Sequence, residues 1–176
     1  MEIKKRLVIV GKGGSGKDHL RKDLVNRGFK YCRSHPTRPI REGEVDGEDY
    51  FFIESSKLPE MAEDFYEGVF FNNWFYGTSN KEFETSNLFI MTPKGISSLK
   101  PKDRKESIVL YLDINEETRR KRLERRRDAD DVKRRLNADS LDFENFKDFD
   151  YSIEDSRFEI DSNPVLLEII NKIAIN

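Results

Sequence analysis

The amino-acid sequence predicts an α/β fold built around a parallel central sheet. Short apolar runs that are typical of strands buried on both faces alternate along the chain with segments of helical pattern. The first apolar run ends in a cluster of glycines that leads directly into a helical segment. This alternation favours helices layered on a sheet, and 176 residues suit one compact domain, 1–176.

The strands are predicted from runs of apolar residues. The clearest buried strands are expected at Arg6–Val10, 87–91 and Ser107–Leu112. Weaker runs predict two further strands, at 29–33 and 50–53. Between these two lies a segment rich in proline, glycine and charge, 34–47, which we expect to be a loop.

The helices are predicted from periodicity and from capping residues. Asn115, followed by two glutamates, is a good helix start because its side chain can accept hydrogen bonds from the first free N–H groups. That helix is expected to run to about residue 127. The other helices are expected at Lys17–Asn26, at 58–67, from Val132 onward and at 165–173.

Charge and cysteine content exclude several classes of protein. Charged residues make up 38% of the chain but the formal net charge is only −2, so neither a basic field for nucleic acid nor an acidic tail is present. The single cysteine, Cys32, excludes an internal disulfide and a multi-cysteine zinc site. No apolar run approaches the roughly 18 to 20 residues that span a bilayer. We expect a cytoplasmic protein with no nucleic-acid or membrane partner.

A phosphate-binding loop is predicted where the first strand meets the first helix. The segment GKGGSGK over residues 11–17 has the spacing G-x-x-x-x-G-K of a P-loop. Its glycines let successive N–H groups point at one anion, the helix N-terminus adds partial positive charge, and the lysine reaches the β- and γ-phosphates. The sequence therefore predicts an ATP site formed by Gly11, Gly13, Gly14, Ser15, Gly16, Lys17 and Asp18.

Asp18 departs from the usual P-loop pattern. It stands where serine or threonine normally offers a hydroxyl group to magnesium. A carboxylate can bind Mg²⁺ directly or through water, although it also adds negative charge close to the triphosphate. The alternative is an ordinary acidic residue at a helix N-terminus. We expect Asp18 to be the metal ligand.

The segment SHPTRPIREGEVDGEDYFF, residues 34–52, resembles the nucleotide-binding signature of guanylate kinases. With the P-loop, a Tyr76-Gly77-Thr78 segment and an arginine-rich helix, the resemblance extends over roughly residues 6–153. It implies a three-layer P-loop NTPase fold with a parallel central sheet, a small inserted monophosphate-binding subdomain and a helical lid. The expected core comprises 1–33, 86–124 and 137–176, the insertion 34–85 and the lid about 125–136.

The predicted acceptor site lies in the segment that carries this resemblance. Arg38 and Arg41 are three residues apart on a loop shaped by glycine and proline, so both guanidinium groups could converge on one phosphate. The resemblance implies that Ser34, Arg38, Arg41, Tyr50 and Tyr76 hold the monophosphate. Glu44 is expected near the sugar or in support of the loop, and Thr78 belongs to the same substrate-binding set.

Several arginines are expected in the lid that closes over ATP in guanylate kinases. Aligning Lys121-Arg122-Leu123 and Arg134-Arg135-Leu136 with the family pattern places Arg122, Arg126 and Arg135 at the matching positions. With Lys17 they form the predicted catalytic set, in which positive charge stabilises the transferring phosphoryl group. A solvated basic helix face is the alternative interpretation.

Two stretches that read guanine in the family are changed. The family has a glutamate after G-x-F-[Leu/Ile] and acids at the end of the third strand; the corresponding residues here are Asn72, Ile90 and Thr92. Guanine presents two adjacent donors, whereas an asparagine side chain offers one acceptor beside a donor. Asn72 is therefore predicted to contact the base and to alter the base preference. Glu67 is the acid that could instead be directed into the pocket.

The sequence predicts an ATP- and Mg²⁺-dependent nucleoside monophosphate kinase, with GMP or dGMP as the first candidate acceptor. A catalytically inactive guanylate kinase-like module that binds a phosphorylated partner is the alternative from another class. It would need Arg38 and Arg41 but neither Lys17 nor the arginine-rich lid. A P-loop kinase acting on another small substrate would explain Lys17 but not residues 34–52. A monomer or a homodimer is expected.

Overall fold

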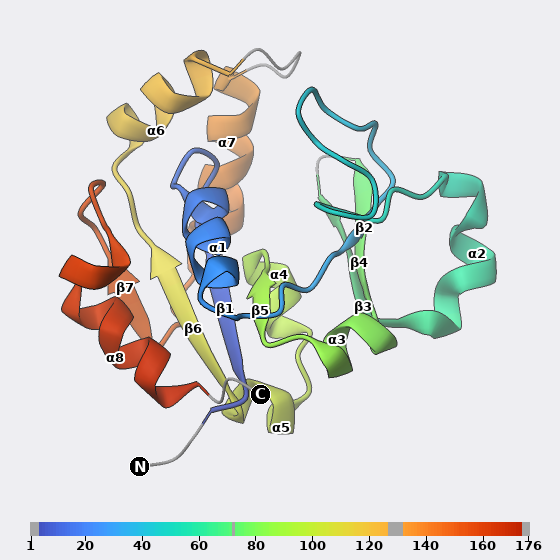
Figure 1. Cartoon of the computed structure of the whole chain (residues 1–176). Coiled ribbons are helices and arrows are strands. Elements are labelled where there is room, and N and C mark those ends of the chain that lie inside the picture. Colours follow the sequence, from blue (N-terminus) through green and yellow to red (C-terminus); the bar gives the residue numbers. More distant parts are fainter. Residues whose placement is uncertain (1–3, 72, 127–131, 174–176) are drawn as a thin grey trace.

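The computed structural model describes residues 4–71, 73–126 and 132–173. Its centre is a parallel four-stranded sheet in the order β5-β1-β6-β7 (Figure 1). The two inner strands are buried along almost their whole length, which explains their continuous apolar sequences. The strands are β1 (Arg6–Val10), β5 (Leu88–Ile90), β6 (Ser107–Leu112) and β7 (Tyr151–Ile153).

Helices cover both faces of this sheet and give the chain its three layers. Leu7 and Ile9 of β1 belong to one apolar cluster, which includes residues of α1 (Lys17–Asn26) and α8 (Pro164–Lys172). The alternate residues of β1 belong to a second cluster on the other face. That cluster includes residues of α3 (Asn80–Thr85), α4 (Pro93–Ser97) and α7 (Val132–Phe143). The sequence prediction of an α/β fold is confirmed.

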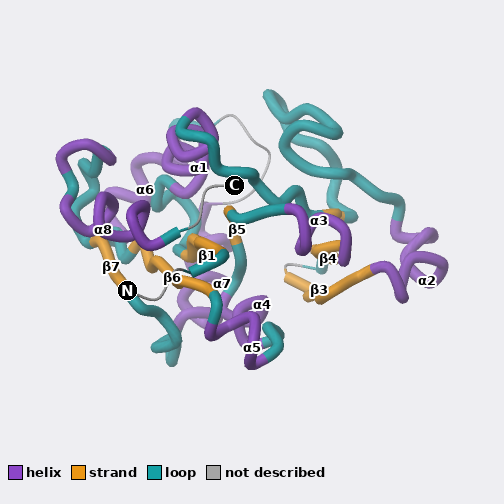
Figure 2. Tube along the Cα trace, turned by 60° about the horizontal axis from the view of Figure 1, so that its bottom comes forward, coloured by secondary structure: helices purple, strands orange, loops and turns teal. Residues whose placement is uncertain are grey.

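A smaller antiparallel sheet lies beside the parallel one, as Figures 1 and 2 both show. Its strand order is β2-β4-β3, with β2 (His35–Pro36), β3 (Phe65–Phe71) and β4 (Trp74–Ser79). All three strands fall within the predicted insertion, 34–85. The limits assigned to core, insertion and lid stay predictions, although α7 runs without a break across the expected boundary at 136 and 137.

The remaining helices are short or lie at the ends of strands. They are α2 (Leu58–Met61), α5 (Pro101–Lys105) and α6 (Glu116–Glu124), with 3-10 turns at Ser55–Lys57, Ala62–Asp64 and Ile160–Ser162. Asn115 caps α6 as predicted, since its Oδ1 accepts a hydrogen bond from Thr118 N at 2.9 Å. None of the helices in the described ranges is long and apolar enough to cross a membrane.

The two strands predicted at 29–33 and 50–53 are absent from the described structure. Tyr31 forms only an isolated bridge with Leu88. The pairing does not extend further because the N–H of Arg33 donates to the Glu82 carboxylate (2.9 Å) instead of to a strand. Residues 50–53 run beside β2, where Phe51 N and Ile53 N donate to carbonyl oxygens. Pro36 has no N–H to donate back to residues 50–53, so the two segments do not form a complete strand pair.

The helix predicted at 58–67 is also wrong in extent. Only Leu58–Met61 is α-helical, and the chain enters β3 at Phe65. Tyr66 stacks on the ring of Phe83, at 3.6 Å between ring centroids, so packing against α3 fixes the segment as a strand. The β3–β4 hairpin was not predicted, because its aromatic residues do not form a run of buried positions.

Candidate active site

The glycine-rich loop joins β1 to α1 at the carboxyl edge of the parallel sheet. Gly14 and Gly16 have φ angles of 78° and 100°, a left-handed conformation that glycine adopts without strain. No described side chain caps the N-terminus of α1, so its first N–H groups are available to an anion. Ser15 is buried, and its Oγ has no hydrogen-bond partner within the described ranges. The loop has the geometry of a phosphate cradle.

Lys17 lies in this cradle, as the motif predicts. Its Nζ donates to the carbonyl oxygens of Gly11 (2.6 Å) and Lys12 (3.2 Å). Burial lowers the pKa of Lys17, and the negative charge of Asp18 opposes that shift. A phosphate beside Nζ would stabilise the buried ammonium group in the same way.

Two charged residues that the sequence did not reveal hold the loop from the outside. Asp139 of α7 accepts a hydrogen bond from Gly13 N at 2.7 Å. Arg119 of α6 donates through Nε to Ile114 O at 2.9 Å, and its Nη1 lies 3.8 Å from Asp139 Oδ2. Both side chains are buried. Because Gly13 and Asp139 are 126 residues apart, no local sequence pattern could have indicated this contact.

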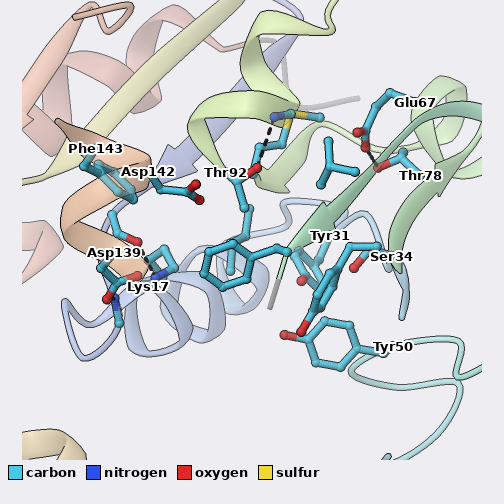
Figure 3. A pocket seen from close by; sticks show the side chains of 18 residues that line it. Lys17, Tyr31, Ser34, Tyr50, Glu67, Thr78, Thr92, Asp139, Asp142 and Phe143 are labelled. Atoms are coloured by element: carbon cyan, nitrogen blue, oxygen red, sulfur yellow. Dashed lines mark hydrogen bonds between the residues drawn. The ribbon is translucent and has the colours of Figure 1, made fainter. Parts of the chain in front are cut away.

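A cavity of about 220 Å³ lies between the loop and the small sheet. Figure 3 shows Lys17 and Asp139 on one side of it and Glu67 and Thr78 on the other. Glu67 Oε1 accepts a hydrogen bond from Thr78 Oγ1 at 2.6 Å, whereas Oε2 is buried with no partner among the described residues. Burial raises the pKa of Glu67, and the Thr78 hydrogen bond opposes this effect.

The predicted base-reading positions have different outcomes. Asn72 lies outside the described residues, so its contact with a base stays a prediction. Ile90 and Thr92 both line the cavity, and Thr92 Oγ1 caps α4 by accepting from Gly95 N at 3.1 Å. Glu67 reaches the cavity because β3 pairs with β4 in a register that sets it opposite Thr78.

The loop that carries the predicted phosphate-binding residues is organised around an ion pair. Arg38 donates to both oxygens of Glu44 (2.7 and 2.6 Å), and Glu44 also accepts from Arg41 N at 2.9 Å. Arg38 is only 4% exposed, and its Nε has no hydrogen-bond partner in the described structure. Through these contacts Glu44 supports the loop, which is one of its two expected roles. A contact between Glu44 and the sugar stays a prediction.

A second cavity, of about 190 Å³, lies next to the first. Lys17, Tyr50 and Tyr76 line both cavities. Three cationic side chains also line the second cavity: Arg41 from the acceptor loop (residues 37–54), Arg126 from just after α6, and Arg135 from the start of α7. Such a concentration of positive charge suits an anionic ligand. Ser34 and Thr78, by contrast, line the first cavity.

Arg122 lies on another side of the P-loop from these arginines. Its Nη1 donates to Gly14 O (3.1 Å) and its Nη2 to Ser156 O (2.8 Å). It lines a third cavity, which borders Gly14 and Gly16 and includes Phe158. The observed contacts brace the loop, and a catalytic role for Arg122 stays a prediction.

The role of Asp18 as a metal ligand stays a prediction. Its side chain is 58% exposed and lines the second cavity. No group of three or more His, Cys, Asp or Glu side chains in the described ranges could hold a metal ion by itself. A magnesium ion at Asp18 would take its other ligands from nucleotide phosphates and water, which agrees with the oxygen ligands that this ion prefers.

Comparison with known proteins agrees with this geometry. The sequence model of the guanylate kinase family matches residues 3–172. Guanylate kinase from Wigglesworthia glossinidia brevipalpis is 31% identical, over 93% of this chain and 86% of that protein. Guanylate kinase from Buchnera aphidicola is 29% identical, over 87% and 81% respectively.

A solved structure shows the same fold. The crystal structure of guanylate kinase from Anaplasma phagocytophilum superimposes with a TM-score of 0.75, at 18% identity, over 98% of this chain and 88% of that chain. The parallel sheet, the P-loop after its first strand and the small sheet beside it are thus parts of a P-loop NTPase fold. With the sequence match over almost the whole chain, these findings show that the protein belongs to the guanylate kinase family.

Proposed function

We propose that this protein transfers the γ-phosphate of ATP to GMP or dGMP. The observation that carries the proposal is Glu67, whose buried Oε2 has no hydrogen-bond partner in the described structure. It faces a cavity that also contains the P-loop lysine, Lys17. An acceptor for base donors and a phosphate-binding lysine therefore line one space.

The chemistry of guanine matches this end of the cavity. Guanine has two adjacent donors, N1–H and N2–H, and an ionised carboxylate accepts both. Leaving a buried carboxylate oxygen unpaired costs about 1–3 kcal/mol or more, so a ligand that donates to Oε2 gains from the preformed arrangement. Val69, Ile90 and Met91 supply apolar walls for the ring. Glu67 thus takes the base-reading role for which Asn72 was predicted.

The acceptor phosphate binds beside Tyr50 and Tyr76, which line both cavities. Arg41, Tyr50 and Tyr76 line the second cavity, and the guanidinium carbon of Arg38 lies 5.0 Å from the centre of the Tyr50 ring. Guanidinium groups bind phosphate through fixed pairs of donors, and two on one loop can bind the same phosphate. This arrangement leaves the acceptor oxygen directed toward Lys17.

Phosphoryl transfer depends on charge stabilisation and alignment. Lys17, Arg126 and Arg135 line the second cavity and stabilise the negative charge that spreads over the transferring group. Bound Mg²⁺ would neutralise part of the charge on the phosphates. The P-loop N–H groups orient the donor triphosphate, and the acceptor loop orients the attacking oxygen.

The P-loop favours a kinase over a module that only binds phosphorylated partners. A binding module needs the acceptor arginines, but it has no use for a lysine in a phosphate cradle. Asp139 and Arg119 also maintain the conformation of that cradle.

An ADP-release assay with ATP, Mg²⁺ and a panel of monophosphates tests the proposal. We expect GMP or dGMP to be the preferred acceptor. Glu67→Gln should reduce the preference for GMP over AMP by about 1–3 kcal/mol in relative kcat/KM, since the amide cannot accept both guanine donors. Asn72→Ala is the matched variant and should leave the preference unchanged. If Asn72→Ala removes the preference and Glu67→Gln does not, Asn72 reads the base.

A further inference from the structure

Arg21 of α1 connects the helix that follows the P-loop with the acceptor loop. Its Nη2 donates to Asp49 Oδ1 at 3.0 Å, and its Nε lies 3.6 Å from Asp18 Oδ1. The guanidinium group also lies over the ring of Tyr31, at 4.7 Å from the centroid. The side chain is 11% exposed. A largely buried cation is thus shared by one carboxylate of the donor site and one of the acceptor loop.

Asp49 links Arg21 to the residues that line the cavities. Its Oδ2 accepts a hydrogen bond from Val45 N at 3.0 Å, which closes the turn between the two residues. Val45 follows Glu44, the carboxylate that holds Arg38 and Arg41 N. Tyr50 follows Asp49 and lines both cavities. The Arg21–Asp49 pair therefore reaches the proposed phosphate-binding residues from either end of this turn.

The acceptor loop depends on side-chain contacts of this kind for its position. Residues 37–54 contain neither helix nor strand. Apart from the Arg21–Asp49 pair, Arg33 donates to Gly47 O at 2.9 Å and contacts Glu82 of α3. The loop's backbone hydrogen bonds to neighbouring segments lie near its two ends, at Thr37, Phe51 and Ile53. The part between them has low local stability unless side-chain contacts hold it. The Arg21 pair is little exposed, so solvent and salt screen it less than a surface pair.

We propose that Arg21 is a positioning residue for the monophosphate acceptor. By pairing with Asp49 it holds the acceptor loop in its phosphate-binding conformation, without itself touching the nucleotide. Its second contact supplies a counter-charge to Asp18, the residue in which this chain departs from the usual P-loop pattern. This inference rests on the proposed function, because it assumes that a nucleoside monophosphate binds beside Tyr50.

Calorimetric titration with GMP, in the absence of ATP and Mg²⁺, tests this role directly. We expect Arg21→Leu to raise the Kd for GMP about tenfold, the effect of losing one charge-assisted hydrogen bond. In steady-state assays the KM for GMP should rise similarly, while kcat and the KM for ATP change less than about twofold, because the Arg21–Asp18 contact is long, at 3.6 Å, and the Asp18 side chain is 58% exposed. Arg21→Lys keeps the positive charge but lacks the forked donors, so its Kd for GMP should lie between those of wild type and Arg21→Leu.

Matched variants separate positioning from general damage. Asp49→Asn breaks the same pair from the loop side and leaves α1 intact, so it should reproduce the effect on GMP even if Arg21→Leu folds poorly. The double variant should bind GMP no more weakly than the worse single variant. Lys22→Leu removes the same charge from the exposed neighbouring position of α1 and should bind GMP as wild type does.

Two results would overturn the inference. One is unchanged GMP affinity in both Arg21→Leu and Asp49→Asn. The other is an equal loss of GMP and ATP affinity together with a lowered melting temperature, which would mean a purely structural role. Both differ from a failure of the proposed function, in which wild type itself would not bind GMP.

Discussion

At the scale of single residues, the two carboxylate oxygens of Glu67 have different surroundings. Oε1 accepts a hydrogen bond from Thr78, whereas Oε2 is buried without a described partner. Burial therefore raises the pKa of this side chain above its ordinary value of 4.5. The folded protein therefore binds the Glu67 proton more tightly than the unfolded chain does. As pH rises from 4.5 through the raised pKa of the folded state, Glu67 ionises and the free energy of unfolding falls. A ligand that donates to Oε2 would reverse that effect.

The first residue-scale prediction is that guanine recognition depends on pH through Glu67. The ionised carboxylate accepts both guanine donors, so kcat/KM for GMP should fall as pH drops through a pKa above 4.5. Glu67→Gln should lack this acid limb but keep any titration of the GMP phosphate, which makes it the control. Initial rates across the pH range, with ATP saturating, measure the difference. Identical profiles in the two proteins would show that another group reads the base.

Single residues were predictable where a motif fixes them. The P-loop spacing indicated Lys17, and the resemblance indicated Ser34, Arg41, Tyr50, Tyr76 and Thr78. All six line the two cavities, and their roles stay predictions. The base-reading position was harder to assign. Alignment on residues 68–71 pointed to Asn72, whereas the register of the β3–β4 hairpin places Glu67 opposite Thr78. That register is a property of strand pairing, which sequence spacing alone did not reveal.

At the scale of elements, local signals were sufficient for the core. β1, α1 and β6 have the predicted bounds because each is specified by its own apolar run or by the glycine cluster before it. Elements that depend on distant partners were predicted less well. The segment 29–33 has apolar residues, but it does not form a strand because the N–H of Arg33 donates to the Glu82 side chain.

The P-loop is held by an element that lies far from it in sequence, and this yields an element-scale prediction. Asp139→Ala removes the acceptor for Gly13 N and the anionic neighbour of Arg119, and leaves both donors buried. We expect the free energy of unfolding to fall by about 1–3 kcal/mol and the KM for ATP to rise. Urea denaturation and steady-state kinetics measure the two effects.

A matched variant on the same helix gives the control for Asp139. Asp142 is exposed and lies three residues further along α7, so Asp142→Ala should change the free energy of unfolding by less than about 0.5 kcal/mol. If Asp139→Ala is as stable as Asp142→Ala and binds ATP normally, α7 does not support the loop in the way described.

At the scale of the whole molecule, the site arises from the meeting of two sheets. Lys17 follows β1 of the parallel sheet, Glu67 lies on β3 of the antiparallel sheet, and the first cavity lies between them (Figure 3). The family resemblance predicted a small inserted monophosphate-binding subdomain, but not its antiparallel sheet. It could not show that Arg122 contacts Gly14 O and Ser156 O, whereas Arg126 and Arg135 line the cavity that Lys17 and Arg41 share. Those positions depend on how α6 and α7 pack, which no local pattern encodes.

The central claim is that the two cavities together carry a phosphate from ATP to GMP. Phosphorus NMR of a mixture of protein, ATP, Mg²⁺ and GMP tests it most directly, because all four nucleotides are seen at once. The account predicts that ADP and GDP appear in equal amounts, and that Lys17→Ala, with its fold intact, slows their formation at least about 100-fold. ADP without GDP, no ADP at all, or wild-type rates in Lys17→Ala would contradict it.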